Sequence, residues 1–301
     1  MIRFVLKRLA FAVVLVLVVT SASFVLVHVA PGDYFTRFGP GGDRRARAER
    51  AAAGFDRPLA VRYAEWLGRA MRLDLGTSLR FQQPVTPLVV RRAINTAILG
   101  TCALVAATLL GLSLGIFTGS GNRVAHRLVE MASSATLAIP PLVWSLGTTA
   151  LTARLGWLPP AGLRPSNLVV PAIALALPAA AWIERVHSRA VRRAMQAPHI
   201  LAARARGIGS ARILWLHASR EALGTTLSTY GVLAGTLLSG SLVVEAIADW
   251  PGLGLLTADA LRARDPYLVC GCSAAAAIIL AVTILACDLL HLWADPRLRT
   301  S

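Results

Sequence analysis

The chain of 301 residues is poor in lysine, in acidic residues and in cysteine. Its only lysine is Lys7. An ATP-binding P-loop needs a lysine after its glycine-rich turn, so this chain cannot supply a Walker-type ATP site of its own. The four cysteines lie in or beside apolar stretches, which favours small buried side chains over a disulfide or a metal site. They are Cys102, Cys270, Cys272 and Cys287.

Patterns typical of catalysis are missing too. The six histidines fall at no metal-ligand spacing. No order of serine, histidine and aspartate, or of cysteine and histidine, can be distinguished from chance. No nucleic-acid-binding module is apparent, although the net charge is +16. We therefore predict no catalytic residue, no metal site and no nucleic-acid partner.

Long apolar stretches, in contrast, are abundant. Hydrophobic residues make up 55% of the chain, and the mean hydropathy is +0.61. Several stretches of about 20 apolar residues are long enough to cross a hydrocarbon core of about 30 Å. The sequence therefore predicts an all-α membrane protein with about six transmembrane helices. The predicted spans are residues 9–30, 95–118, 128–150, 168–186, 223–246 and 269–293.

The first apolar stretch, residues 9–30, follows a basic start at residues 1–8. It is longer than the apolar part of a secretory signal peptide and ends without a convincing cleavage site, so we predict a transmembrane helix. Arginines are concentrated in alternate short loops, and this asymmetry places both termini in the cytoplasm. The long, arginine-rich region at 31–92 argues the other way, but long translocated segments follow this rule less closely.

The polar region after the first span is predicted to be a small extracytoplasmic subdomain. It contains one amphipathic helix at 58–71, which we expect Asp56 to cap. The predicted organisation is thus an N-terminal tail with the first helix at 1–30, the extracytoplasmic region at 31–93, a five-helix core at 94–296 and a cytoplasmic tail at 297–301.

Prolines, glycines and acidic residues in the spans give further predictions. Pro140, Pro141 and Pro178 should interrupt two spans, which a membrane protein tolerates beside a cavity or neighbouring helices. Gly111 and Gly115, and likewise Gly231 and Gly235, have the small-residue spacing of closely packed helices. Four acidic residues lie near predicted span ends, and we expect them to be interfacial or paired with a nearby arginine: Glu130, Glu184, Glu245 and Asp288.

A basic, hydrophilic stretch at 185–223 separates two apolar segments. Glycine in a helix interior costs about 1 kcal/mol relative to alanine, so Gly207 and Gly209 predict a break between two short helices. Ser210 is a candidate N-cap for the second helix. That helix carries an apolar knob at 213–216 among basic residues. One charge sign and an exposed apolar knob suit docking in a groove of a partner, but an ordinary charged loop would look the same.

The basic stretch and several other segments of the sequence resemble a known family. The stretch Ala202-Ala203-x-x-x-Gly207, followed by His217-Ala218, resembles the EAA loop of permease subunits of ATP-binding cassette importers. Leu201 stands where many members have Glu, and Ser219 and Arg220 stand where Leu and Pro often follow. Other matches resemble the dipeptide and oligopeptide branch. They are Ala30-Pro31-Gly32-Asp33, Asp74-Leu75-Gly76-Thr77-Ser78, Trp250-Pro251-Gly252-Leu253-Gly254 and Asp295-Pro296-Arg297.

The resemblance implies a non-catalytic subunit of the bacterial inner membrane that forms half of a translocation pathway. Its partners would be a second homologous permease, two ATPase subunits, an extracytoplasmic substrate-binding protein and membrane lipid. ATP and Mg²⁺ would be bound by the ATPases, and this chain would need no cofactor. The loop at 187–223 would dock in an ATPase cleft and couple ATP hydrolysis to transport.

The resemblance also implies site residues. The coupling residues would be Ala202, Ala203, Arg204, Arg206, Gly207, Ile213, Leu216 and His217. The binding protein would contact Trp250, Pro251, Gly252 and Gly254. The expected cargo is a peptide, while nickel or an oligosaccharide remains an alternative within the same branch. A secondary carrier would instead need a charge pair within the spans and an internal repeat, which the sequence lacks. A membrane-embedded enzyme would need a convergent nucleophile or metal set, which is also lacking.

Overall fold

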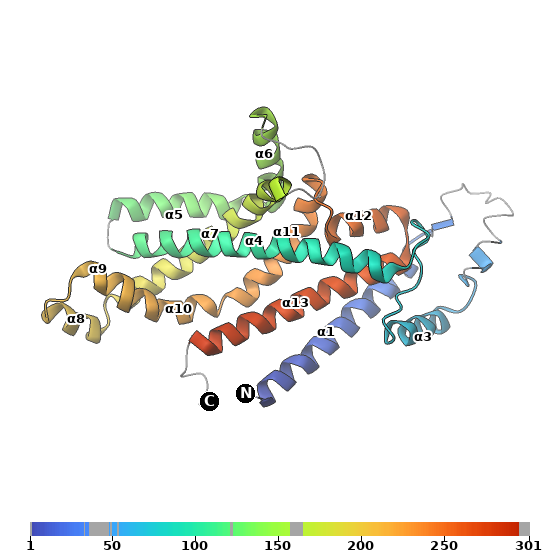
Figure 1. The fold of residues 1–301 in the computed structure, drawn as a ribbon, viewed down its shortest axis with the longest axis horizontal. Coiled ribbons are helices and arrows are strands. Elements are labelled where there is room, and N and C mark those ends of the chain that lie inside the picture. Colours follow the sequence, from blue (N-terminus) through green and yellow to red (C-terminus); the bar gives the residue numbers. More distant parts are fainter. Residues whose placement is uncertain are drawn as a thin grey trace. The chain divides into compact units, whose positions relative to one another are not determined.

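The computed structural model describes residues 2–32, 34–35, 48, 50–52, 54–120, 123–156 and 165–294. These residues form helices and no strand; one isolated bridge joins Thr77 and Pro84. The prediction of an all-α protein is confirmed (Figure 1). The helices are α1 (Ile2–Val29), α3 (Leu59–Ala70), α4 (Val85–Gly119), α5 (Arg123–Ala138), α6 (Pro141–Arg154), α7 (Pro165–Ala194), α8 (Pro198–Ala205), α9 (Ser210–Arg212), η2 (Ile213–Ala218), α10 (Ser219–Leu227), α11 (Tyr230–Ile247), α12 (Leu253–Ala263) and α13 (Pro266–Ala294).

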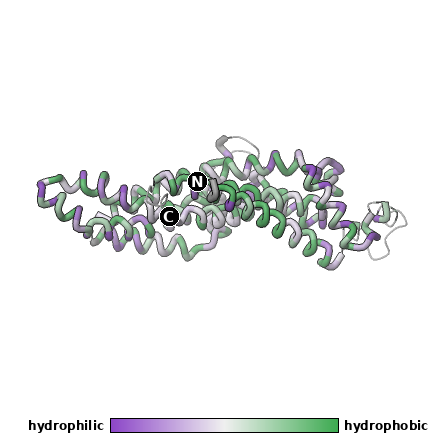
Figure 2. The backbone as a smooth tube through the Cα atoms, turned by 90° about the horizontal axis from the view of Figure 1, so that it is seen from below, coloured by the Kyte–Doolittle hydropathy of each residue, from purple (hydrophilic) through white to green (hydrophobic). Residues whose placement is uncertain are grey.

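Five of the described helices are long and apolar enough to cross a membrane: α1, α4, α7, α11 and α13. Helix α1 is almost uniformly hydrophobic after its first turns, whereas hydrophilic residues alternate with hydrophobic ones around α8 and α9 (Figure 2). A helix that is apolar all round suits a lipid environment. The prediction of membrane spans is confirmed for these five helices, and a sixth span stays a prediction.

The predicted span at 128–150 consists of two helices. Helix α5 has 16 residues and ends at Ala138, and α6 has 14 residues and begins at Pro141. Pro140 lies between them in an extended conformation. Proline has no N–H and disfavours helical geometry in the residue before it, so the break predicted here is confirmed. Each piece is shorter than the roughly 20 residues that a span requires.

Helix α7 is longer than predicted. Pro178 lies inside it and does not end it, and the kink predicted at this residue stays a prediction. Helices α5, α6, α10 and α11 pack against α7 and support it there. Its end at Ala194 also moves the start of the predicted loop at 187–223, because arginine is a good helix former and the charged residues simply continue the helix. At the other end of that loop, the predicted span at 223–246 is divided into α10 and α11.

The chain divides into two compact units. The first contains Ala97–Trp250 and the end of α13, and the second contains Ile2–Thr96 and Pro251–Ala281. Helix α7 is the centre of the first unit, with α5 and α10 among its neighbours (Figure 1). Its core consists of small and branched apolar side chains, including Leu99, Ala174, Ile183, Leu233 and Val244.

Glycines allow α4 to approach α7 very closely within the first unit. A Cβ atom on Gly111 would lie 2.6 Å from Cβ of Ile183 and 2.8 Å from the carbonyl oxygen of Ala180. A Cβ atom on Gly115 would lie 2.9 Å from Cβ of His187. These distances leave no room for a side chain, and the close packing predicted from the Gly111–Gly115 spacing is confirmed. Gly231 of α11 has no atom within 4 Å of such a Cβ, so no helix approaches closely at this residue.

The second unit includes the predicted extracytoplasmic subdomain. Trp66 of α3 is 1% exposed and lies in one cluster with Phe24 of α1 and Cys270 of α13. The described part of this region therefore shares a core with α1 and α13 rather than forming a separate subdomain. Pro58 occupies the N-cap of α3 without a side-chain hydrogen bond, so the predicted cap by Asp56 is wrong.

A buried carboxylate joins distant parts of the second unit. Asp265 is completely buried between α12 and α13. Its Oδ2 accepts hydrogen bonds from the Ser78 hydroxyl at 2.6 Å and from the backbone N–H of Arg80 at 3.1 Å. Its Oδ1 accepts one from the N–H of Leu268 at 3.2 Å. The two sequence motifs around Ser78 and Asp265 are thus halves of one hydrogen-bonded clamp.

We expect Asp265→Ala to lower the thermal stability of the protein. The substitution leaves three donors without their acceptor, and each unsatisfied buried group costs about 1–3 kcal/mol. Asp259→Ala is the control, because Asp259 is partly exposed and pairs with Arg80 at 3.4 Å and with Arg262 at 4.0 Å, and each such surface pair is worth about 0–1 kcal/mol. The midpoint of thermal unfolding in detergent measures both effects. Equal midpoints for the two variants would contradict the clamp.

Candidate coupling segment

The segment from α8 to α10 contains the residues predicted to couple the chain to a partner. Helix α8 begins at Pro198, a position where the missing N–H costs nothing. It ends in a left-handed turn at Gly207, whose φ is +78°. The N–H of Gly207 donates to the carbonyl of Arg204 at 2.9 Å, and the N–H of Ile208 donates to that of Ala203 at 3.2 Å. This is a Schellman motif, and glycine suits its left-handed position because it has no Cβ.

The second half of the segment contains an unusual helix. Ser210 is the first residue of α9, and Gly209 occupies the N-cap without a side-chain bond, so the predicted cap by Ser210 is wrong. The chain then widens into the π-helix η2. Ile213 and Ala218 are both 0% exposed although they are five residues apart. The hydrogen bonds of a π-helix join residues five apart, so the wider helix brings both side chains to the buried face.

Two small cores hold this segment together. Ile200, Ala203 and Ile213 pack α8 against η2. A second cluster packs Ala218 of η2 and Ala222 of α10 against the end of α7. Ala203 and Ile213 were predicted as coupling residues, and their burial shows that they support the segment from inside rather than present a docking surface.

Other predicted coupling residues are at the surface. Ala202, Arg204, Arg206 and Gly207 are exposed, and Leu216 is 61% exposed. His217 is partly buried. Trp215 lies beside Leu216 and is 60% exposed, although it was not among the predicted site residues. The signal in the sequence that could have identified it was a tryptophan within an apolar run between Arg212 and Arg220. Of the apolar knob predicted at 213–216, only Trp215 and Leu216 are exposed, and we keep the name apolar knob for this exposed pair.

Hydrogen bonds connect the segment to α7. His187 of α7 is 0% exposed, and its Nδ1 lies 2.8 Å from the hydroxyl of Thr226 in α10. The hydroxyl of Ser219, the first residue of α10, lies 3.4 Å from its Nε2. A buried polar contact of this kind fixes the relative position of two helices because each group would otherwise lack a partner. These contacts therefore fix the orientation of α10 relative to α7.

One turn before His187, Glu184 links α7 to two further helices. It is 1% exposed, and its carboxylate oxygens accept hydrogen bonds from Thr118 of α4 and Ser133 of α5, each at 2.8 Å. Its partners in the described part of the chain are thus hydroxyls and not an arginine. Glu245 is also buried, at 0% exposed, whereas Glu130 is exposed. The interfacial position of these residues stays a prediction.

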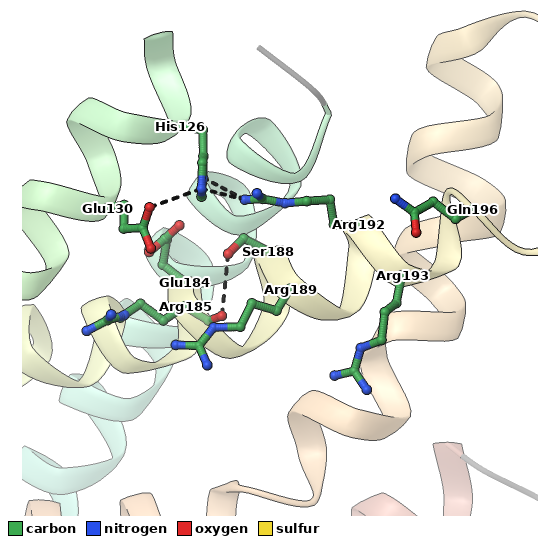
Figure 3. A pocket seen from close by; sticks show the side chains of 9 residues that line it. All are labelled: His126, Glu130, Glu184, Arg185, Ser188, Arg189, Arg192, Arg193 and Gln196. Carbon is green, nitrogen blue, oxygen red and sulfur yellow. Dashed lines mark hydrogen bonds and ion pairs between the residues drawn. The ribbon is translucent and has the colours of Figure 1, made fainter. Parts of the chain in front are cut away.

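A pocket of about 470 Å³ lies between α5 and the end of α7. Figure 3 shows His126 between Glu130 and Arg192 on one side of this pocket. Three more arginines of α7, together with Glu184, Ser188 and Gln196, complete its lining. Among the described residues, no group of three or more histidine, cysteine or acidic side chains is placed to hold a metal ion.

The residues predicted to contact a binding protein are mostly buried. Trp250 is 5% exposed and belongs to the core of the first unit. Gly252 and Gly254 are buried, and Pro251 is partly exposed. The carbonyl of Pro251 accepts a hydrogen bond from the Asn95 side chain at 2.7 Å, so these residues stabilise the chain internally. Because most of them are buried, their exposure gives no support to the predicted contact with a binding protein.

Comparisons with known proteins agree with this arrangement. Residues 111–300 match the family described as binding-protein-dependent transport system inner membrane component, and residues 1–100 match the N-terminal part of such membrane components. The chain is 29% identical to the oligopeptide transport system permease protein AppB of Bacillus subtilis, over 99% of both chains. It is 29% identical to the dipeptide transport system permease protein DppB of Escherichia coli, again over 99% of both. A putative peptide transport system permease protein of Brucella abortus is 30% identical over 98% of both.

Proposed function

The chain belongs to the family of binding-protein-dependent transport system inner membrane components, and from this premise we propose that it forms half of the translocation pathway of an ATP-driven peptide importer. The observation that carries the proposal is the match along nearly the whole chain to relatives named as peptide, dipeptide and oligopeptide permeases. Five described helices are suited to cross a membrane, as such a subunit requires.

We propose that the segment from α8 to α10 transmits the motion of an ATPase partner. Its knob is exposed and apolar, basic side chains surround it, and two small cores keep it rigid. An exposed aromatic residue beside exposed arginines has the composition of an interface hot spot. The hydrogen bonds of His187 would carry a displacement of α10 into α7.

The proposed partners follow from what the chain lacks. Without a lysine for a P-loop, it needs ATPase subunits to bind ATP and Mg²⁺. A chain that forms half of a pathway needs a second permease for the other half. Because the family is described as binding-protein-dependent, we also propose an extracytoplasmic binding protein that delivers the cargo. We place the subunit in the inner membrane with both termini in the cytoplasm, since the basic segment from α8 to α10 then faces the ATPases.

Purification of the tagged chain from its native membrane in mild detergent tests this proposal. Two ATPases and a second permease should accompany it, as identified by mass spectrometry. ATP hydrolysis by the complex in liposomes should rise when the binding protein is supplied with di- or oligopeptides. Stimulation by nickel or an oligosaccharide instead would move the cargo to those alternatives. A chain that came out alone and transported in response to an ion gradient would be a secondary carrier, and the proposal would be wrong.

Substitution of Gly207 by valine should uncouple the ATPases without preventing insertion into the membrane. A β-branched residue is strained at a φ of +78°, and the left-handed conformation costs about 1–2 kcal/mol, so α8 would end differently and Arg204 would move. Peptide-stimulated ATP hydrolysis measures the effect. Gly209→Ala is the control, since φ at Gly209 is −60° and no atom lies within 4 Å of the added Cβ. Normal stimulation in Gly207→Val would count against the coupling role.

A further inference from the structure

Three arginines on α7 have no acidic partner in the described part of the chain. Arg185, Arg189 and Arg193 follow one another at intervals of four residues, so they lie along one side of the helix over about 12 Å. Figure 3 shows their side chains extending from the same side of α7, away from His126. All three line the pocket between α5 and α7. Such a row repels itself, and an anion placed beside it would relieve the repulsion.

The acidic residues of the same pocket are already engaged. Glu184 is buried and accepts hydrogen bonds from two hydroxyls. Glu130 pairs with His126 at 3.1 Å, and the guanidinium of Arg192 lies 2.7 Å from the same imidazole. Glu130 and Arg192 therefore balance each other across His126. The positive charge of the row remains without compensation, in a cavity of about 470 Å³.

The surroundings of the row point to a ligand with an apolar part. Trp182 lies one turn before Arg185 on the same side of α7 and is 41% exposed. Tryptophan is enriched where membrane helices meet the headgroup level, and α7 is one of the helices suited to cross the membrane. The side chain of Trp182 thus gives the row an exposed apolar neighbour on its own helix.

We propose that this pocket binds the headgroup of an anionic glycerophospholipid. The phosphate lies among Arg185, Arg189 and Arg193, whose guanidinium groups donate to its oxygens. The acyl chains lie beside the exposed side chain of Trp182. Basic pockets between helices at the end of a membrane span are the sites where such lipids are held. The site is separate from the coupling segment, so its occupancy does not depend on the cargo of the importer.

Titration of phosphatidylglycerol and of phosphatidylcholine into the full chain in detergent, followed by native mass spectrometry, tests the proposal. The wild-type chain should retain phosphatidylglycerol in preference to phosphatidylcholine. Each arginine replaced by glutamine should weaken phosphatidylglycerol binding by about fivefold, and Arg185→Gln/Arg189→Gln/Arg193→Gln should abolish the preference. The matched control is Arg204→Gln/Arg206→Gln/Arg212→Gln, which removes the same charge from the coupling segment and should leave the preference intact.

Four outcomes would overturn the proposal. The first is equal retention of the two lipids by the wild-type chain, and the second is an unchanged preference in the α7 triple variant. The third is occupancy by glycerol 3-phosphate at the same concentration, which would identify a site for a soluble phosphate. The fourth is loss of the co-purifying ATPases, with lipid preference retained, in the α7 triple variant, which would assign the row to a protein interface. Arg189→Gln alone, with its fivefold effect, serves where the triple variant does not fold.

Discussion

Replacement of Trp215 and Leu216 by serine is expected to leave the chain folded and to reduce peptide-stimulated ATP hydrolysis by about thirtyfold or more. Both side chains are about three-fifths exposed, so their loss removes little from the core of the chain. In an interface the same tryptophan would be buried, and truncation of such an anchor costs at least about 2 kcal/mol of binding, which is a factor of about thirty. The effect therefore appears only when the ATPases are present.

Two comparisons make this test specific. Trp293→Ser changes the same residue type at 76% exposure outside the segment and should preserve stimulation. Ile213→Ser changes a buried residue of the segment and should lower stability as well as stimulation, because the polar hydroxyl enters a small apolar core. Co-purification of the ATPases and their hydrolysis rate are the two measurements. If the Trp215/Leu216 double variant still bound the ATPases normally, the apolar knob would not be the docking surface.

Alanine at Gly111 and Gly115 is expected to destabilise the first unit severely. Each added Cβ would lie within 3 Å of an α7 side chain, and at Gly111 it would also meet the carbonyl of Ala180. Because backbone cannot move aside locally, α4 and α7 must separate, and overpacking of this kind costs about 1–3 kcal/mol at each site. We expect a lower midpoint of thermal unfolding for the double variant and a reduced yield of folded protein from the membrane.

The same substitution elsewhere should have the opposite sign. Gly147 and Gly231 are helical, and no atom lies within 4 Å of a Cβ placed on either. Alanine at these positions should raise stability by up to about 1 kcal/mol each, because it is the better helix former. A lower midpoint in Gly147→Ala/Gly231→Ala, equal to that of the Gly111/Gly115 pair, would show that helix geometry and not the close approach of α4 to α7 decides the outcome.

The length of the apolar stretches located the long helices, but not where they end. Helices such as α1 and α13 are apolar over most of their length, and their approximate positions follow from that fact alone. The end of α7 was predicted too early, because arginines lower the hydropathy as a loop does, although they continue a helix readily. Proline had two outcomes, ending a helix at Pro140 and lying inside one at Pro178, and the neighbouring helices that decide between them are not visible in a single sequence.

In the candidate site, too, some features could be predicted from the sequence and others could not. The helix break at Gly207 and the exposure of Leu216 follow from the residues of the segment alone, and both agree with the structure. The burial of Ile213 does not, because an α-helical repeat places residues 213 and 218 on different faces and only the π-helix η2 brings them together. The partners of Glu184 could not be foreseen, since they come from α4 and α5, 66 and 51 residues away.

The division of the chain has a consequence for biosynthesis. Most of the first unit is one continuous stretch, Ala97–Trp250, whereas the second needs both Ile2–Thr96 and Pro251–Ala281. During translation, Ser78 must therefore wait for Asp265, 187 residues later, and Asn95 must wait for Pro251. The first helices to emerge from the ribosome complete their own unit only when the chain is nearly finished. A nascent chain interrupted after Trp250 would thus carry most of its first unit but only Ile2–Thr96 of its second. It would expose apolar surface that Pro251–Ala281 covers in the finished protein, and such surface makes incomplete folds prone to aggregate.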